Sequence, residues 1–166
     1  MNIEKCVFYD DSYGSQVKRY IIERSMQIGK KVDSVEIENL FDLVAGHLIL
    51  GINRMELLEG LFYIYDIKKS LQSGFFRIHA DETLLDSDRI ISDMLMLVFS
   101  ELKLSSLHIN VTAGYEKIKN NLMKNGFLIE VVWPNFIACA NGYKDLITLG
   151  ITQEEFDVFR KRAKNI

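Results

Sequence analysis

The sequence predicts an α/β domain with a mixed central sheet. In its second half, strand-like and helix-like hydrophobic patterns alternate, which is typical of a sheet with some parallel neighbours. In the middle of the chain, aromatic and aliphatic segments follow one another over short connections, which favours antiparallel pairing. The 166 residues, 48% hydrophobic and 26% charged, suffice for one domain with its own core. We therefore expect residues 1–166 to form a single domain.

The first half is expected to combine short strands with two helices. Apolar residues recur at helical spacing over residues 16–29 and 36–44, so each segment is predicted to be a helix. Apolar and aromatic runs indicate extended structure elsewhere. The predicted strands cover residues 3–9, 47–52, 60–67 and 75–80.

The clearest helix is predicted over residues 88–102, where a broad apolar face recurs and Asp86 or Ser87 can cap the first turn. A short buried strand is expected at residues 107–111. A further helix over residues 115–125 should end at a glycine, Gly126.

The last part of the chain is predicted to be a hairpin followed by a helix. Strands are expected over residues 127–133, 136–140 and 143–149, and Asn141-Gly142 is a strong hairpin signal between the last two. The segment from Thr152 to Glu155 has the pattern of a capping box, so it should open the final helix.

Composition argues against several functional classes. The formal net charge of −3 disfavours a nucleic-acid partner. No apolar run approaches the ~18 residues of a membrane span, and the first residues lack an apolar signal core. Cys6 and Cys139 show neither metal-binding nor disulfide spacing, so both are expected to be buried thiols in a reducing compartment. We expect a cytoplasmic protein with no metal, no nucleic acid and no membrane partner.

Three short motifs resemble the GNAT family of N-acetyltransferases. The first is Leu97-Val98-Phe99-Ser100-Glu101-Leu102-Lys103-Leu104 before the strand at 107–111, and the second is Lys124-Asn125-Gly126-Phe127. The third, Asn141-Gly142-Tyr143-Lys144-Asp145 followed by Glu154-Glu155-Phe156, is similar to the ending of the ribosomal-protein and sugar N-acetyltransferase branches. The resemblance covers residues 75–156. It implies a mixed, mostly antiparallel sheet with a parallel strand pair at a splay, and helices on both faces.

The resemblance also implies a site for acetyl-CoA or another acyl-CoA between the strands at 75–80 and 107–111. The pyrophosphate would lie on the loop before the long helix, because a helix N-terminus offers free N–H groups and a positive dipole end. The residues then expected to bind the cofactor are Ile78, His79, Ala80, Leu85, Ser87, Asp88 and Arg89.

That loop departs from the family pattern of glycines. Leu85 stands where a glycine is expected. Carboxylates oppose a pyrophosphate through like-charge repulsion, and only Arg89 offsets them. The acidic residues of the loop are Asp81, Glu82, Asp86 and Asp88. The structural reading is that Asp86 and Asp88 cap the helix, because acidic residues favour the start of a helix.

Acyl transfer to an amine calls for a general acid and a general base. The family's tyrosine acid falls on Leu122, which cannot donate a proton, so Tyr115 is the candidate acid. The candidate bases are Glu59, His79 and His108. Each has a structural alternative: helix-start packing for Tyr115, a solvated turn for Glu59, and ordinary strand positions for the two histidines.

Two functions remain open from the sequence. The first is an N-acyltransferase that moves an acetyl or acyl group from CoA to an amine on a small molecule or a protein. The second is a catalytically inactive GNAT-fold domain that binds a protein or another ligand, which the acidic loop favours. The aromatic strands could also support a homodimer. A third reading is an unrelated α/β protein that shares the pattern by chance.

Overall fold

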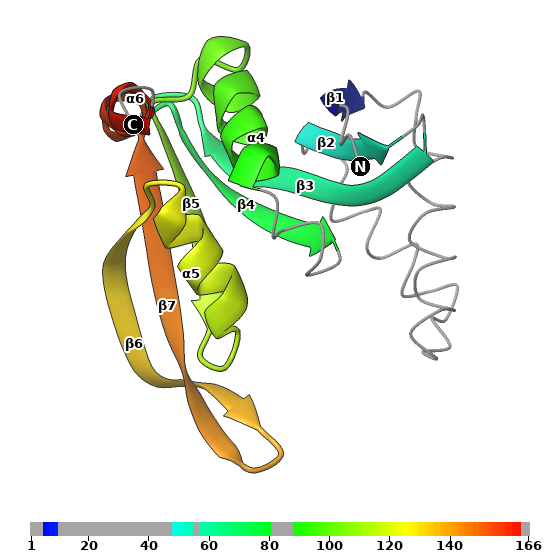
Figure 1. Cartoon of the computed structure of the whole chain (residues 1–166). Coiled ribbons are helices and arrows are strands. Elements are labelled where there is room, and N and C mark those ends of the chain that lie inside the picture. Colours follow the sequence, from blue (N-terminus) through cyan, green and yellow to red (C-terminus); the bar gives the residue numbers. More distant parts are fainter. Residues whose placement is uncertain (1–4, 10–47, 55–56, 81–87, 164–166) are drawn as a thin grey trace.

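The computed structural model describes residues 5–9, 48–54, 57–80 and 88–163. Its centre is a seven-stranded sheet in the order β1-β2-β3-β4-β5-β7-β6 (Figure 1). Every neighbouring pair is antiparallel except β4 and β5, which run parallel. The strands are β1 (Lys5–Tyr9), β2 (Leu48–Arg54), β3 (Leu57–Lys68), β4 (Ser73–Ala80), β5 (Ser106–Thr112), β6 (Leu128–Cys139) and β7 (Gly142–Thr152). The predicted mixed sheet with one parallel pair is therefore confirmed.

Helices α4 (Asp88–Ser100) and α5 (Glu116–Lys124) lie on the same face of the sheet, and α6 (Gln153–Ala163) lies at its end (Figure 1). Their apolar sides bury the main core against alternate residues of the central strands. Its largest fully buried side chains include Phe62, Phe76, Phe127, Phe156, Ile90, Met94 and Leu95. The helices predicted over residues 16–29 and 36–44 lie outside the described residues. None of the described helices is long and apolar enough to cross a bilayer.

The end of α5 follows the prediction from Gly126. The N–H of Phe127 donates to the carbonyl of Leu122 (3.2 Å), and the N–H of Gly126 donates to that of Met123 (3.1 Å). These two bonds form a Schellman motif, which needs a left-handed residue just past the helix. Gly126 supplies it with φ of +95°. The turn directs the buried Phe127 into the core at the start of β6.

The capping box at the start of α6 is also confirmed. The N–H of Glu155 donates to Oγ1 of Thr152 (3.2 Å). In return, Oε2 of Glu155 accepts from the backbone N–H and the hydroxyl of Thr152, both at 2.8 Å. The reciprocal bonds satisfy N–H groups that the first turn leaves without helical partners.

Strand β6 corrects the prediction of two strands over residues 127–133 and 136–140. It is one edge strand from Leu128 to Cys139, with a break in its register between Trp133 and Ile137. Pro134 lies in this break, where the strand gives up no ladder hydrogen bond. Asn135 takes φ of +53°, and its N–H donates to Oδ1 of Asp145 (2.8 Å). The irregular segment is thus part of the strand, and the predicted hairpin to β7 follows it directly.

Candidate active site

Strands β4 and β5 separate soon after they meet. Their pairing runs from Ser73 opposite Ser106 to Phe75 opposite His108 and then stops. Beyond that point β4 remains bonded to β3 and β5 to β7, while the two facing edges have no partner among the described strands. We call this opening the splay. Peptide groups along a separated strand edge call for other hydrogen-bond partners, so the splay is suited to a chain-like polar ligand.

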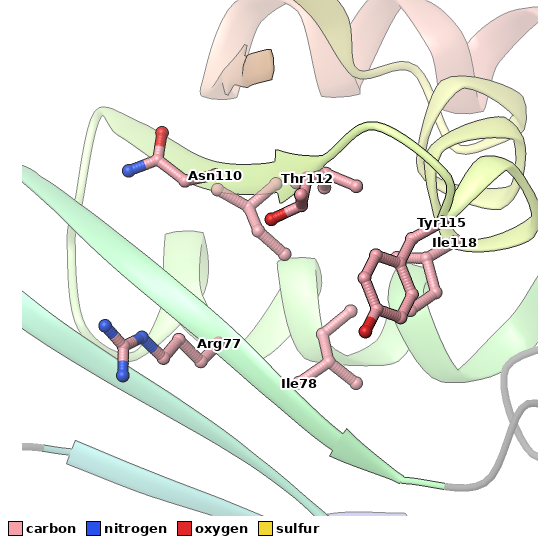
Figure 2. A pocket seen from close by; sticks show the side chains of 8 residues that line it. Arg77, Ile78, Asn110, Thr112, Tyr115 and Ile118 are labelled. Atoms are coloured by element: carbon pink, nitrogen blue, oxygen red, sulfur yellow. The ribbon is translucent and has the colours of Figure 1, made fainter. Parts of the chain in front are cut away.

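A cavity of about 240 Å³ lies in the splay (Figure 2). Successive residues of a strand point to opposite faces of its sheet. The cavity is lined by residues that point to one face of the sheet and by residues that point to the other. It therefore passes between the two strands rather than lying on one face. The lining residues are Arg77, Ile78, Ile109, Asn110, Val111, Thr112, Tyr115 and Ile118.

Tyr115 reaches the cavity from the turn between β5 and α5. Its N–H donates to the carbonyl of Thr112 (3.2 Å), and its own carbonyl accepts from Lys119 in the first turn of the helix (3.1 Å). Gly114 permits this tight connection with φ of +105°. The side chain of Tyr115 is 56% exposed, and Figure 2 shows its ring beside Ile118. A phenol at this position can exchange a proton with a ligand in the splay.

Arg77 is the charged residue of the cavity lining. Its guanidinium carbon lies 5.2 Å from the centre of the Tyr65 ring, a cation–π distance that restrains a long side chain. Neighbouring Tyr63 is partly buried. Burial raises the pKa of Tyr63, and the positive charge of Arg77 partly opposes that rise. The tyrosine is therefore a neutral hydroxyl at physiological pH.

A hydrogen-bond relay leads from the cavity to the edge of the sheet. The hydroxyl of Thr148 donates to Oδ1 of Asn110 (2.8 Å), and the indole N–H of Trp133 donates to the same hydroxyl (3.4 Å). The relay fixes the Asn110 carbonyl toward β7. The amide N–H groups of Asn110 take no part in this relay.

The structure brings together two of the predicted site residues, Ile78 and Tyr115, which both line the cavity. His79 and Ala80 follow Ile78 at the end of β4, but their side chains lie outside the described residues. Asp88 is the first residue of α4, and Arg89 follows it with an exposed side chain. The predicted loop residues, Leu85 and Ser87, lie outside the described residues.

The two other candidate bases, Glu59 and His108, lie on strands β3 and β5. Glu59 belongs to β3 rather than to a turn, and it falls at a bulge where Ile52 pairs with Gly60 and Asn53 with Leu58. Its side chain is outside the described residues. His108 pairs with Phe75 before the splay opens and is hydrogen-bonded to Glu130, so it does not line the cavity.

Sequence reasoning missed the polar side of the cavity, formed by Arg77, Asn110 and Thr112. A signal was present in β5, where the polar residues 108, 110 and 112 alternate with the apolar residues 107, 109 and 111. Such alternation indicates one buried and one open face. Arg77 is likewise the one charge among the residues of β4. Neither pattern says that the two strands diverge, so the cavity itself could not be predicted from the residues.

No family model matches the sequence, and no curated protein matches it significantly. Solved structures do match. A chimera of spermidine N-acetyltransferase SpeG from Vibrio cholerae and hSSAT superposes with a TM-score of 0.72 and 17% identity, over 92% of this chain and 98% of that chain. Spermidine N-acetyltransferase from Vibrio cholerae in complex with CoA and spermine gives 0.71 and 16%, with the same coverage of 92% and 98%. The chain therefore has the fold of the GNAT N-acetyltransferases.

Proposed function

We propose that the protein is a GNAT N-acyltransferase, which moves an acetyl or another acyl group from CoA to an amine on a small molecule or a protein. The observation that carries the proposal is the cavity in the splay of β4 and β5, with the Tyr115 side chain in its wall. The similar structure that contains CoA and spermine supports it, because a protein of the same fold binds both kinds of ligand. One sheet joins all seven described strands, which supports a single domain over residues 1–166.

The described part of the splay fits the arm of CoA. That arm is a narrow chain with amide groups, and the facing edges of β4 and β5 offer unpaired peptide groups beyond Phe75 and His108. Ile78 and Val111 add apolar walls. The loop that contains Leu85 and Ser87 is expected to bind the pyrophosphate. It lies outside the described residues, so this binding role stays a prediction.

When bound, acyl-CoA supplies a thioester: the amine nitrogen forms the new C–N bond, the C–S bond breaks, one proton leaves the nitrogen and one arrives on the sulfur. Tyr115 is the proposed donor of the second proton, from its hydroxyl in the cavity wall. His79, directly after the cavity residue Ile78, is the proposed acceptor of the first. Glu59 is the alternative base.

We further propose that the chain self-associates through β6. This edge strand exposes a run of large apolar residues, and its single acidic residue, Glu130, is bonded to His108 within the fold. An exposed apolar edge strand is a template for pairing with another strand. A second copy is the proposed partner, because a spermidine N-acetyltransferase of the same fold is dodecameric. The apolar residues are Leu128, Ile129, Val131, Val132, Trp133 and Phe136.

A cytoplasmic location is also proposed. Cys139 carries a free thiol, and this thiol is exposed rather than buried as the sequence predicted. Such a thiol persists where glutathione keeps cysteines reduced.

Calorimetric titration with acetyl-CoA and with CoA tests the enzyme proposal. We expect micromolar binding, which Ile78→Trp should weaken because the indole would fill the apolar side of the cavity, where the CoA arm is placed. Leu71→Trp is the matched control, since Leu71 is 66% exposed and lies outside the cavity. Absence of binding at millimolar ligand would instead favour the catalytically inactive GNAT-fold domain, and the search would turn to its binding partner.

A further inference from the structure

The cavity has an apolar side and a polar side. Ile109 and Val111 are almost fully buried and belong to the helix-covered face, as do Ile78 and the α5 residue Ile118. The intervening Asn110 is exposed and belongs to the opposite face. In Figure 2, Arg77 and Asn110 lie at one side of the cavity, away from Tyr115 and Ile118. A ligand that spans the splay therefore meets two different chemical environments.

The polar side, formed by Arg77, Asn110 and Thr112, offers hydrogen-bond donors and one positive charge. Arg77 carries a guanidinium, which donates through its N–H groups and accepts nothing. The side chain of Arg77 is exposed, and its guanidinium carbon lies 5.2 Å from the centre of the Tyr65 ring. Asn110 contributes amide N–H donors, because its carbonyl oxygen already accepts from Thr148. Within the described part of the chain, no carboxylate forms an ion pair with Arg77.

The charge of this side selects among acceptors. A planar guanidinium matches the paired oxygens of a carboxylate or a phosphate. It repels an ammonium group, and no described carboxylate in the cavity lining offsets that repulsion. Spermine, which occupies the similar structure, is a polycation and lacks any anionic group. The described cavity is therefore poorly matched to a polyamine.

We propose that the acceptor is an amine that also carries an anionic group, a carboxylate or a phosphate, and that Arg77 and Asn110 bind that group. This inference rests on the proposed acyl transfer. The anion lies on the polar side, and the amine points through the splay toward Tyr115. The acceptor class thus follows from this chain's own cavity, in contrast to the polyamine of its structural neighbour.

Arg77 has a second conceivable ligand, the phosphates of the cofactor. Its place in the fold argues against that assignment. The pyrophosphate is expected at the start of α4, which begins at Asp88, well past the end of β4. This helix packs on the face of the sheet that carries the buried Phe76, and the exposed Arg77 points to the other face. We therefore expect CoA affinity to be insensitive to Arg77.

Acetyl transfer to matched amines tests the proposal. Phenylalanine is paired with phenethylamine, and phosphoethanolamine with ethanolamine, so each pair differs only in the anion; spermidine is the polycationic comparison. We expect kcat/KM to favour at least one anionic member by roughly 10- to 100-fold, the worth of one charge-assisted hydrogen bond. A preference in the phenylalanine pair would identify the bound anion as a carboxylate, and a preference in the phosphoethanolamine pair would identify it as a phosphate. Spermidine as the best acceptor, or no preference within either pair, would overturn the proposal.

Variants assign the preference to the guanidinium. Arg77→Gln should remove it, Arg77→Lys should retain part of it, and Arg77→Glu should shift it toward spermidine, each with an unchanged dissociation constant for CoA. Lys124→Gln removes the same charge from the far end of α5 and should change neither quantity. A loss of CoA affinity in Arg77→Gln, with the acceptor preference intact, would assign Arg77 to the cofactor and refute the proposal.

A binding experiment without CoA separates this inference from the proposed function. The chain contains a single tryptophan, Trp133, which is linked through Thr148 to Asn110 at the cavity. Its fluorescence should report binding of the anionic amines to the wild type and not to Arg77→Gln. If CoA fails to bind while this signal remains, the acyl-transfer proposal is wrong and the anion site stands. If CoA binds and no anionic amine does, the reverse holds.

Discussion

The imidazole of His108 reaches the carboxylate of Glu130 across Gly150, with Nδ1 of the histidine 2.8 Å from Oε2 of the glutamate. His108 on β5 and Leu128 on β6 both stand opposite Gly150 on β7. The other ring nitrogen of His108 lies 3.2 Å from Oγ of Ser106. The pair joins β5 to β6 over the intervening strand. His108, one of the candidate bases, therefore helps to hold two strands of the sheet together.

Gly150→Ala should break this contact. An added Cβ would collide with the carboxylate of Glu130, which would have to turn away from His108. We expect a loss of about 1 kcal/mol in the free energy of unfolding, the usual net worth of one hydrogen bond. Urea denaturation measures it. In a Glu130→Ala background the same substitution should cost nothing, and an equal cost in both backgrounds would show that the carboxylate is not the obstacle.

Tyr115→Phe tests the proposed proton donor. The ring and its packing remain, while the hydroxyl at the cavity is lost. We expect kcat to fall about 100-fold, at the lower end of general acid–base contributions because a thiolate is a good leaving group. The dissociation constant for CoA, measured by calorimetry, should stay unchanged. A variant with wild-type kcat would remove Tyr115 from the chemistry and leave it a packing residue.

Gly126→Ala and Gly142→Ala separate backbone strain from crowding. Both glycines have positive φ, +95° and +118°, so alanine should cost about 1–2 kcal/mol at either site. At Gly126 the new Cβ would also lie 3.3 Å from side-chain atoms of Ile151 and Phe159, whereas nothing lies within 4 Å at Gly142. Gly126→Ala should therefore unfold at the lower urea concentration. Equal midpoints would mean that the core beside α5 relaxes freely.

Tyr63 should deprotonate only above pH 10.0, the ordinary pKa of tyrosine, because burial raises its pKa. The stability linked to this raised pKa is complete below pH 10.0 and is lost as the pH rises through the folded-state value. Tyr63→Phe should consequently flatten the loss of stability at alkaline pH. Since Arg77 opposes the rise, Arg77→Gln should move the titration still higher. The difference in phenolate absorbance between wild type and Tyr63→Phe measures it, and an unshifted titration would contradict the burial of this hydroxyl.

The proposed self-association depends on the apolar surface of β6. Val132 and Phe136 are 50% and 61% exposed, so changing both to aspartate should spare the core and remove the contact. Light scattering after size-exclusion chromatography should show an oligomer for the wild type and a monomer for the double variant. Leu71→Asp alters an equally exposed apolar residue away from β6 and should leave the oligomer intact. A monomeric wild type would refute the proposal.

The sequence predicted features whose cause is local. Gly126 ends α5, Thr152 and Glu155 cap α6, and Asn141-Gly142 marks the hairpin, because each depends on neighbours within a few residues. The sequence did not predict features that depend on segments far apart in the chain. The strands predicted separately over residues 127–133 and 136–140 are one strand, because the edge position of β6 tolerates Pro134 within it.

The candidate site was likewise predicted only in part. Tyr115 and Ile78 were found through the resemblance, and both line the cavity. The polar side of Arg77 and Asn110 was missed, because its meaning depends on where β4 and β5 separate. That separation is a property of the whole sheet and leaves no mark at single residues.

The splay has a consequence for how far such proteins can diverge. Every residue type except proline presents the same peptide N–H and C=O, so a ligand held by strand edges places few demands on side chains. Nearly all residues of β4 and β5 could then be substituted during evolution without loss of the splay, provided that the two strands separate at the same point. Identities of 16–17% alongside one shared fold are what such a main-chain site permits. Selection would act on the few side chains that choose the acceptor, and each lineage could alter those independently of the scaffold.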